Sequence, residues 1–186
     1  MLSDAVRRAH AAAVAADEPG YLDPETGFFV FTATALLGRG ASPPGHAPRP
    51  IEPLVVHDSL VFFSGIAPLD VTGVVGTDLT VDQAYEVAGT LALMAMRRIV
   101  DAFGSLDAVE RWIKVLAFVR SAPGFGDQPA VVNGFSDRVI EVYGTQRGRC
   151  ARSAIGVSEL PRHIPIEIEA IVALRSGAGT DRRADG

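Results

Sequence analysis

The sequence is poor in the residues that build metal centres and disulfide frameworks. Its 186 residues include a single cysteine, Cys150, and four histidines that lack the spacing of metal ligands. One cysteine excludes an intrachain disulfide and a cysteine-rich metal site. We therefore expect no metal centre, and we interpret Cys150 as a packed structural thiol that could lie near Arg152.

Long apolar runs and an excess of positive charge are also missing. No run approaches the roughly 18 apolar residues of a membrane-spanning helix, and the first 20 residues are too charged for a signal-peptide core. The 17 basic and 22 acidic residues give a net charge of −5, which argues against nucleic-acid binding. We expect a soluble cytoplasmic protein without membrane contact.

What is present indicates one globular domain with terminal additions. Hydrophobic residues make up 48% of the chain and charged residues 21%, a balance typical of folded proteins. Residues 1–50 form an N-terminal extension, with a predicted helix over 3–17, an apolar segment over 28–37 and a Gly/Pro-rich linker. Residues 51–174 form the main domain, and residues 175–186 are predicted to be a disordered tail.

The main domain alternates strand and helix patterns. Thr80 and Gln83 form a predicted capping box, and Gly104 stands where the following helix should end. A short helical turn is expected near 107–112, and a second helix runs from Pro129 to Gly144. The strands are expected at 54–57, 60–64, 73–76, 113–119, 149–157 and 164–174.

This order predicts an α+β fold in which two helices cover one face of a mixed sheet. Phe62, Leu116, Phe118 and Ile171 alternate with residues that are also apolar, so the second face should be apolar too. Either a second copy of the chain covers that face, which we favour, or the N-terminal 50 residues do.

An arginine in the middle of the strand 149–157 is unusual. Alternation places Arg152, Ala154 and Gly156 on one face, and a buried guanidinium needs an acceptor. Its planar fork suits a carboxylate. If the last two strands pair like a hairpin, Arg152 comes close to one glutamate of the last strand, Glu167 or Glu169, which suits hydrolysis at carbon or, alternatively, a structural ion pair.

Three stretches carry a family resemblance. LVFFSGIAP, GFGDQPAVVNGFSDRVIEVYG and CARSAIGVSELPRHIPIEIEAIVAL follow one another in this order within residues 51–174. They resemble signatures of the Rid family of imine and enamine deaminases, also called YjgF-like proteins. The ARSAIGV stretch is similar to a bacterial subgroup of that family.

The resemblance implies a chorismate-mutase-like protomer and a homotrimer whose sheets form an inner barrel, with active sites between protomers. It implies that Arg152 binds the substrate carboxylate and that Glu167 orients water. Asn133, Gly65 and Ala154 would support substrate binding. Leu54 stands where the better-known deaminases carry tyrosine, and Ile66 where they carry glutamine, which points to a larger or more apolar substrate.

The implied reaction is hydrolytic deamination of 2-imino or enamine acids to 2-keto acids and ammonia. It requires no metal, flavin or pyridoxal cofactor, because positioning and charge stabilisation suffice for an electrophilic imine. The alternatives are a non-catalytic trimer that binds small carboxylates, and a biosynthetic cyclase or isomerase that uses the same cleft. Ribonuclease activity fits the acidic charge poorly.

The N-terminal stretch YLDPETGFFVFTATALLGRG resembles small bacterial domains of unknown function. Those domains continue into a cysteine cluster, whereas this chain reads ASPPGHAPRP. A metal role is therefore not expected here. The segment is interpreted as an addition packed on the trimer exterior or, alternatively, as a docking surface for a partner enzyme.

Overall fold

The computed structural model describes residues 20–22, 29–31, 51–68 and 70–177. The chain divides into two compact units, Met1–Pro50 and Ile51–Gly186. In the first unit, β1 (Gly20–Leu22) pairs antiparallel with β2 (Phe29–Phe31). The predicted helix over 3–17, the linker and the tail beyond Gly177 lie outside the described residues.

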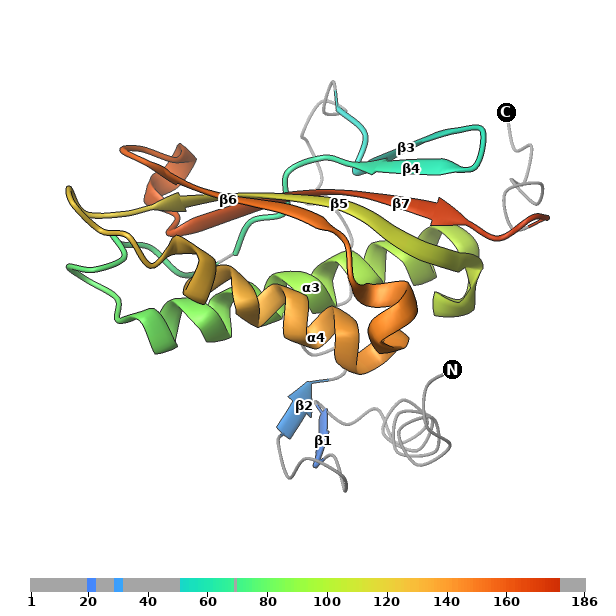
Figure 1. Cartoon of the computed structure of the whole chain (residues 1–186), viewed down its shortest axis with the longest axis horizontal. Helices are drawn as coiled ribbons and strands as arrows, with labels where there is room; N and C mark the ends of the chain where they lie inside the picture. The colour runs from blue at the N-terminus through green and yellow to red at the C-terminus, as the bar shows by residue number, and fades with distance from the viewer. Residues whose placement is uncertain (1–19, 23–28, 32–50, 69, 178–186) are drawn as a thin grey trace, which may run out of the picture. The chain divides into compact units, whose positions relative to one another are not determined.

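The second unit is a five-stranded mixed sheet with two long helices on one side of it (Figure 1). Within the sheet the order is β3-β4-β7-β5-β6, and every neighbouring pair is antiparallel except the parallel pair β5 and β6. The predicted α+β class is thereby confirmed. Its elements are β3 (Leu54–His57), β4 (Leu60–Phe63), α3 (Val81–Phe103), β5 (Val109–Arg120), α4 (Gln128–Gly148), β6 (Ala151–Val157) and β7 (Ile166–Leu174).

Helix α3 begins and ends where the sequence indicates. The Thr80 hydroxyl accepts from the Gln83 N–H at 3.2 Å, and the Gln83 side chain accepts from the Thr80 N–H at 2.9 Å. Gly104 ends the helix with a φ of 74°, in the left-handed region that glycine adopts without strain. Two orphan N–H groups at the start of the helix are therefore satisfied locally.

Two predicted elements differ in the structure. The segment 73–76 forms only isolated bridges through Val75, because Gly73 and Gly76 adopt positive φ and turn the chain. The helical turn expected near 107–112 is a 3-10 turn over Leu106–Ala108, and β5 already begins at Val109. Trp112 is therefore a strand residue.

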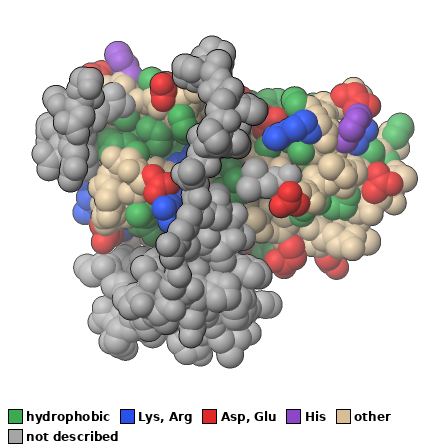
Figure 2. Space-filling model, turned by 180° about the vertical axis from the view of Figure 1, so that it is seen from behind, with side chains coloured by type: hydrophobic (Ala, Val, Ile, Leu, Met, Phe, Trp, Pro, Cys, Tyr) green, Lys and Arg blue, Asp and Glu red, His purple; other side chains and the backbone are tan. Residues whose placement is uncertain are grey.

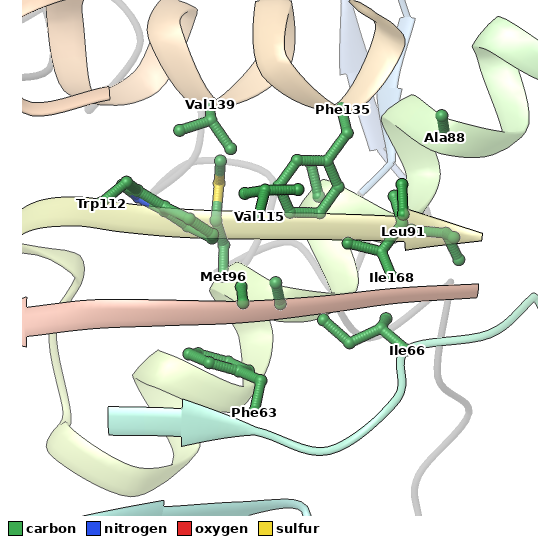
Figure 3. Close-up of a cluster of buried hydrophobic side chains, with 14 of the residues drawn as sticks. Phe63, Ile66, Ala88, Leu91, Met96, Trp112, Val115, Phe135, Val139 and Ile168 are labelled. Carbon is green, nitrogen blue, oxygen red and sulfur yellow. The ribbon is translucent and has the colours of Figure 1, made fainter. Parts of the chain in front are cut away.

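The core lies between the sheet and the two helices (Figure 3). Trp112 is fully buried, and its ring meets Phe135 of α4 at 5.6 Å and Phe63 of β4 at 6.3 Å between centroids. Aromatic contacts of this kind add to the free energy gained from apolar burial. They join β4, β5 and α4 into one packed layer.

The sheet face opposite the helices is apolar in part. The register places Phe62 beside Ile171, and Phe118 beside Ile155 and Glu167, all on this face. Phe62 is 39% exposed and Ile155 is 44% exposed. The four apolar residues singled out in the sequence therefore share one open face. No helix of the described residues is long and apolar enough to cross a membrane.

Candidate active site

Arg152 projects from the edge strand β6 toward helix α4. It pairs with Val115, which is buried on the helix-facing side of the sheet. Its Nη1 donates to Asn133 Oδ1 and to Ser136 Oγ, both at 2.9 Å, and its Nη2 donates to the Pro129 carbonyl at 3.4 Å. We call Arg152, Asn133, Ser136 and Pro129 the arginine cluster. The sequence predicted that a buried Arg152 would need hydrogen-bond acceptors, and the three acceptors in the structure are all uncharged oxygens.

The arginine cluster leaves part of the guanidinium free. An arginine carries five N–H donors, two of them on Nη1. Asn133 and Ser136 use both Nη1 donors, and Pro129 uses one on Nη2. Among the described residues, the Nε–H and one Nη2–H have no acceptor, and no carboxylate forms an ion pair with Arg152. Free donors on two nitrogens of one guanidinium can hold a carboxylate in two hydrogen bonds.

Helix α4 supplies the support for this arginine from one face. Asn133 and Ser136 are three residues apart, so their side chains lie on the same side of the helix. The family resemblance pointed to Asn133, whereas Ser136 was missed. Its spacing from Asn133 is the signal that could have found it.

Glu167 lies on the other face of the sheet. It alternates with Ile166 and Ile168, which are fully buried under the helices, and it pairs with Phe118. Its carboxylate rests against Gly65, where an added Cβ would stand only 2.0 Å from Oε1. We call Gly65 and Glu167 the glutamate cluster. The glycine leaves room for the carboxylate in this position, because a side chain at residue 65 would displace it.

The expected approach of Arg152 to Glu167 within one chain is wrong. Strand β5 lies between β6 and β7, so these two strands do not pair. The helical crossover through α4 makes β6 parallel to β5, and β7 then adds antiparallel on the other edge of β5. Because the two side chains also face opposite ways, a structural Arg152–Glu167 ion pair within the protomer is excluded as well.

The other residues singled out from the sequence, Ala154, Leu54 and Ile66, lie at three different places in the sheet and its core. Ala154 follows Arg152 on the helix-facing side of β6 and pairs with Ala117. Leu54, on β3 at the opposite edge of the sheet, is half-buried against the core. Ile66 is fully buried beside Ile168 (Figure 3). Ile66, which stands where the better-known deaminases carry glutamine, therefore packs in the core of the protomer, and the larger or more apolar substrate stays a prediction that rests on Leu54 alone.

A cavity of about 350 Å³ opens where β5 and β6 begin, and the residues that line it belong to neither cluster. Its lining includes Arg111, Trp112, Arg149 and Cys150. Burial raises the pKa of the Cys150 thiol, and this outweighs the opposite effects of Arg152, Lys114 and Arg111 on that pKa. The thiol therefore stays protonated at neutral pH, as suits a packed cysteine and not a nucleophile.

Comparison with known proteins identifies the family. The model of a family described as endoribonuclease L-PSP matches residues 45–174, more than half of the chain. The chain belongs to the endoribonuclease L-PSP family. This family lies within the YjgF/Rid superfamily, so the resemblance in the sequence motifs is confirmed at that level. The bacterial subgroup stays a prediction.

Proteins with solved structures share the fold of this chain. The Agrobacterium tumefaciens protein Atu1372, of unknown function, is 34% identical, with a TM-score of 0.66 over 68% of this chain and 83% of that one. A protein of Shewanella oneidensis, named provisionally as an endoribonuclease, is 20% identical, with a TM-score of 0.66 over 88% and 97% of the two chains. At that identity, the second likeness shows the fold alone.

Two further matches concern parts of the chain. Protein TCP17 of Trypanosoma cruzi is 40% identical over 105 residues, which are 56% of this chain. The match spans 66% of TCP17, just under two thirds of its length. The model of a family of unknown function, DUF5522, matches residues 9–41, a range that contains the stretch that resembled small domains of unknown function.

Proposed function

We propose that this L-PSP family protein hydrolyses reactive 2-imino or enamine acids to 2-keto acids and ammonia. The observation that carries the proposal is the unpaired fork of Arg152. A half-buried guanidinium that is held in place by neutral groups, with two adjacent donors free, is prepared for an external carboxylate. Arg152 therefore binds the carboxylate that every 2-imino acid carries.

The reaction needs one water and balances without electron transfer. Water adds to the imine carbon as Glu167 accepts a proton from it, and the same proton passes to the nitrogen. Glu167 then takes the proton of the new hydroxyl group and passes it to the amine, so that the C–N bond breaks as the C=O bond forms, ammonia leaves and a 2-keto acid remains. Because the imine is already electrophilic, orientation of the water and stabilisation of charge can supply most of the acceleration.

The opposite orientations of the two clusters support a site shared between copies of the chain. The arginine cluster lies on the helix-facing side of the edge strand β6, and the glutamate cluster lies toward the open face. That open face carries exposed apolar side chains such as Phe62 and Ile155, which favours burial against another copy. We propose a homotrimer with the sheets inside, in which Arg152 of one copy and Glu167 of the next act on one substrate.

RNA cleavage is the second candidate, because the matched family is described as an endoribonuclease. The charge does not favour it. The chain has a net charge of −5, and on the face shown in Figure 2 the basic side chains are interspersed with acidic ones. Binding to a phosphate backbone instead relies on clustered lysines and arginines.

The test measures release of 2-keto acid from an imine that an amino-acid oxidase generates in situ. Arg152→Met should lower kcat/KM by about 30-fold or more, because loss of a charged anchor costs about 2 to 5 kcal/mol. Arg138→Met is the matched control, since Arg138 lies on α4 and is paired with Glu141. It should retain full activity.

Three results would count against the deaminase. An unchanged rate in the Arg152→Met protein removes Arg152 from the reaction. Binding of a 2-keto acid without any turnover of imine favours the non-catalytic carboxylate-binding trimer. Cleavage of RNA by wild-type protein that shows no imine turnover favours the ribonuclease.

A further inference from the structure

Arg98 of helix α3, like Arg152, carries a positive charge that no carboxylate balances. Four of the six half-buried arginines among the described residues lie within 4.0 Å of a carboxylate oxygen, and only Arg98 and Arg152 do not. The four ion pairs are Arg97–Asp101, Arg120–Glu159, Arg138–Glu141 and Arg147–Asp107. An unbalanced half-buried cation is costly unless other groups stabilise it.

Backbone carbonyls stabilise Arg98 instead. Its Nη1 donates to the Ser64 carbonyl at 2.9 Å and to the Pro53 carbonyl at 3.2 Å, and its Nη2 donates to the Gly65 carbonyl at 3.4 Å. Burial lowers the pKa of this guanidinium, and no acid offsets that effect. One side chain thus joins α3 to the start of β3 and to the turn after β4.

The same turn forms the wall behind Glu167. On its far side, Ile66 and Ile168 exchange two backbone hydrogen bonds of 2.8 and 3.0 Å, one residue beyond Gly65 and Glu167 respectively. The backbone around Gly65 is therefore held on one side by Arg98 and on the other by the hydrogen bonds between Ile66 and Ile168. Since an added Cβ on Gly65 would stand 2.0 Å from Glu167 Oε1, a small movement of the turn changes the space left for the carboxylate.

We propose that Arg98 is a positioning residue, which fixes the carbonyls of Ser64 and Gly65 and thereby the place of the Glu167 carboxylate. This inference rests on the proposed deaminase function, in which Glu167 handles the protons of the attacking water. Arg98 itself does not touch the substrate. It acts on the proton-transfer half of the site and leaves the carboxylate-binding half, around Arg152, as it is.

The experiment compares Arg98→Met with Arg97→Met in the full-length protein. Arg97 is the preceding residue of the same helix, and its Nε donates to Asp101 at 2.7 Å. The measurements are kcat and KM for the imine, the Kd of 2-oxobutanoate as a carboxylate probe, and the thermal midpoint. We expect kcat of Arg98→Met to fall about 10- to 100-fold, the range that a displacement near 1 Å can cause. The Kd of the probe should stay within about twofold, as should every value for Arg97→Met.

Arg98→Lys is the second variant and decides the question if Arg98→Met does not fold. A lysine keeps the charge as a point and cannot span three carbonyls in the manner of a guanidinium, so its kcat should fall between wild type and Arg98→Met. A wild-type kcat in Arg98→Met or, if that variant does not fold, in Arg98→Lys overturns the inference and leaves the deaminase proposal intact. Equal losses of kcat and probe affinity overturn it too, since they show general damage. If wild-type protein itself turns over no imine, the proposed function fails, and the inference fails with it.

Discussion

Arg152 and Glu167 point away from each other, on opposite faces of one sheet and with strand β5 between their strands. Each has its own supporting group, the arginine through Asn133 and the glutamate through Gly65. A single chain therefore presents two separated halves of the predicted site. The relationship has direct consequences for how variants of the two residues should behave when mixed.

Inactive variants of the two halves should restore each other. Arg152→Ala and Glu167→Ala are each expected to lose imine turnover when expressed alone. In co-expressed trimers that mix at random, about a quarter of the interfaces would bring an intact arginine to an intact glutamate. The keto-acid assay on the co-purified protein should therefore show about a quarter of wild-type activity. A co-purified mixture that stays inactive would show that Arg152 and Glu167 do not act together across a subunit interface.

Gly65→Ala should impair catalysis more than folding. The new methyl group would meet the Glu167 carboxylate, which is the far end of a flexible side chain and can move away. We expect kcat/KM to fall about 10- to 100-fold through displacement of the carboxylate, while the thermal midpoint stays near that of wild type. Gly126→Ala is the control, since its Cβ would find no atom within 4 Å. Unaltered kinetics in Gly65→Ala would show that Glu167 is not positioned by this contact.

Gly134→Ala should destabilise the fold at the crossing of α3 and α4. An added Cβ would stand 2.0 Å from the Tyr85 carbonyl oxygen, which belongs to the helix backbone and cannot move alone. Overpacking of this kind costs about 1 to 3 kcal/mol. At Gly89 the nearest atom would be 3.6 Å away, so Gly89→Ala should be neutral or up to about 1 kcal/mol stabilising. Urea denaturation distinguishes the two variants. Equal denaturation midpoints would mean that α3 and α4 can move apart at Gly134 without a cost in stability.

The Cys150 thiol should react slowly with alkylating agents in the native protein. Burial raises its pKa, so at pH 8 iodoacetamide should modify it more slowly than it modifies a cysteine in a short peptide. The pKa of this thiol is higher in the folded protein than in the unfolded chain. Its contribution to the stability of the fold is therefore fully present below the unfolded-state pKa and is lost as pH rises through the folded-state pKa. The alkylation rate should keep rising with pH beyond the ionisation of the peptide thiol. A plateau at lower pH would indicate a cation-activated cysteine instead.

Local sequence determined the helix ends and the faces of the strands. Thr80, Gln83 and Gly104 specify α3 through contacts within four residues of each other or through backbone freedom at one position. Alternation correctly put Arg152 and Ala154 on one side of β6, since the side-chain period of a strand is fixed at two. The motif resemblance supplied the family, which the match over residues 45–174 confirms.

Only the tertiary structure decided which strands are neighbours and what surrounds each predicted side chain. The α4 crossover placed β6 beside β5, and this separated Arg152 from Glu167, which the sequence alone had suggested to pair. Packing also buried Ile66 in the core and brought Arg98 to carbonyls more than 30 positions away in the chain. Such contacts depend on strand order and on helix packing across the whole domain. Because they join residues that are far apart in the sequence, they produce no local periodic pattern from which they could be predicted.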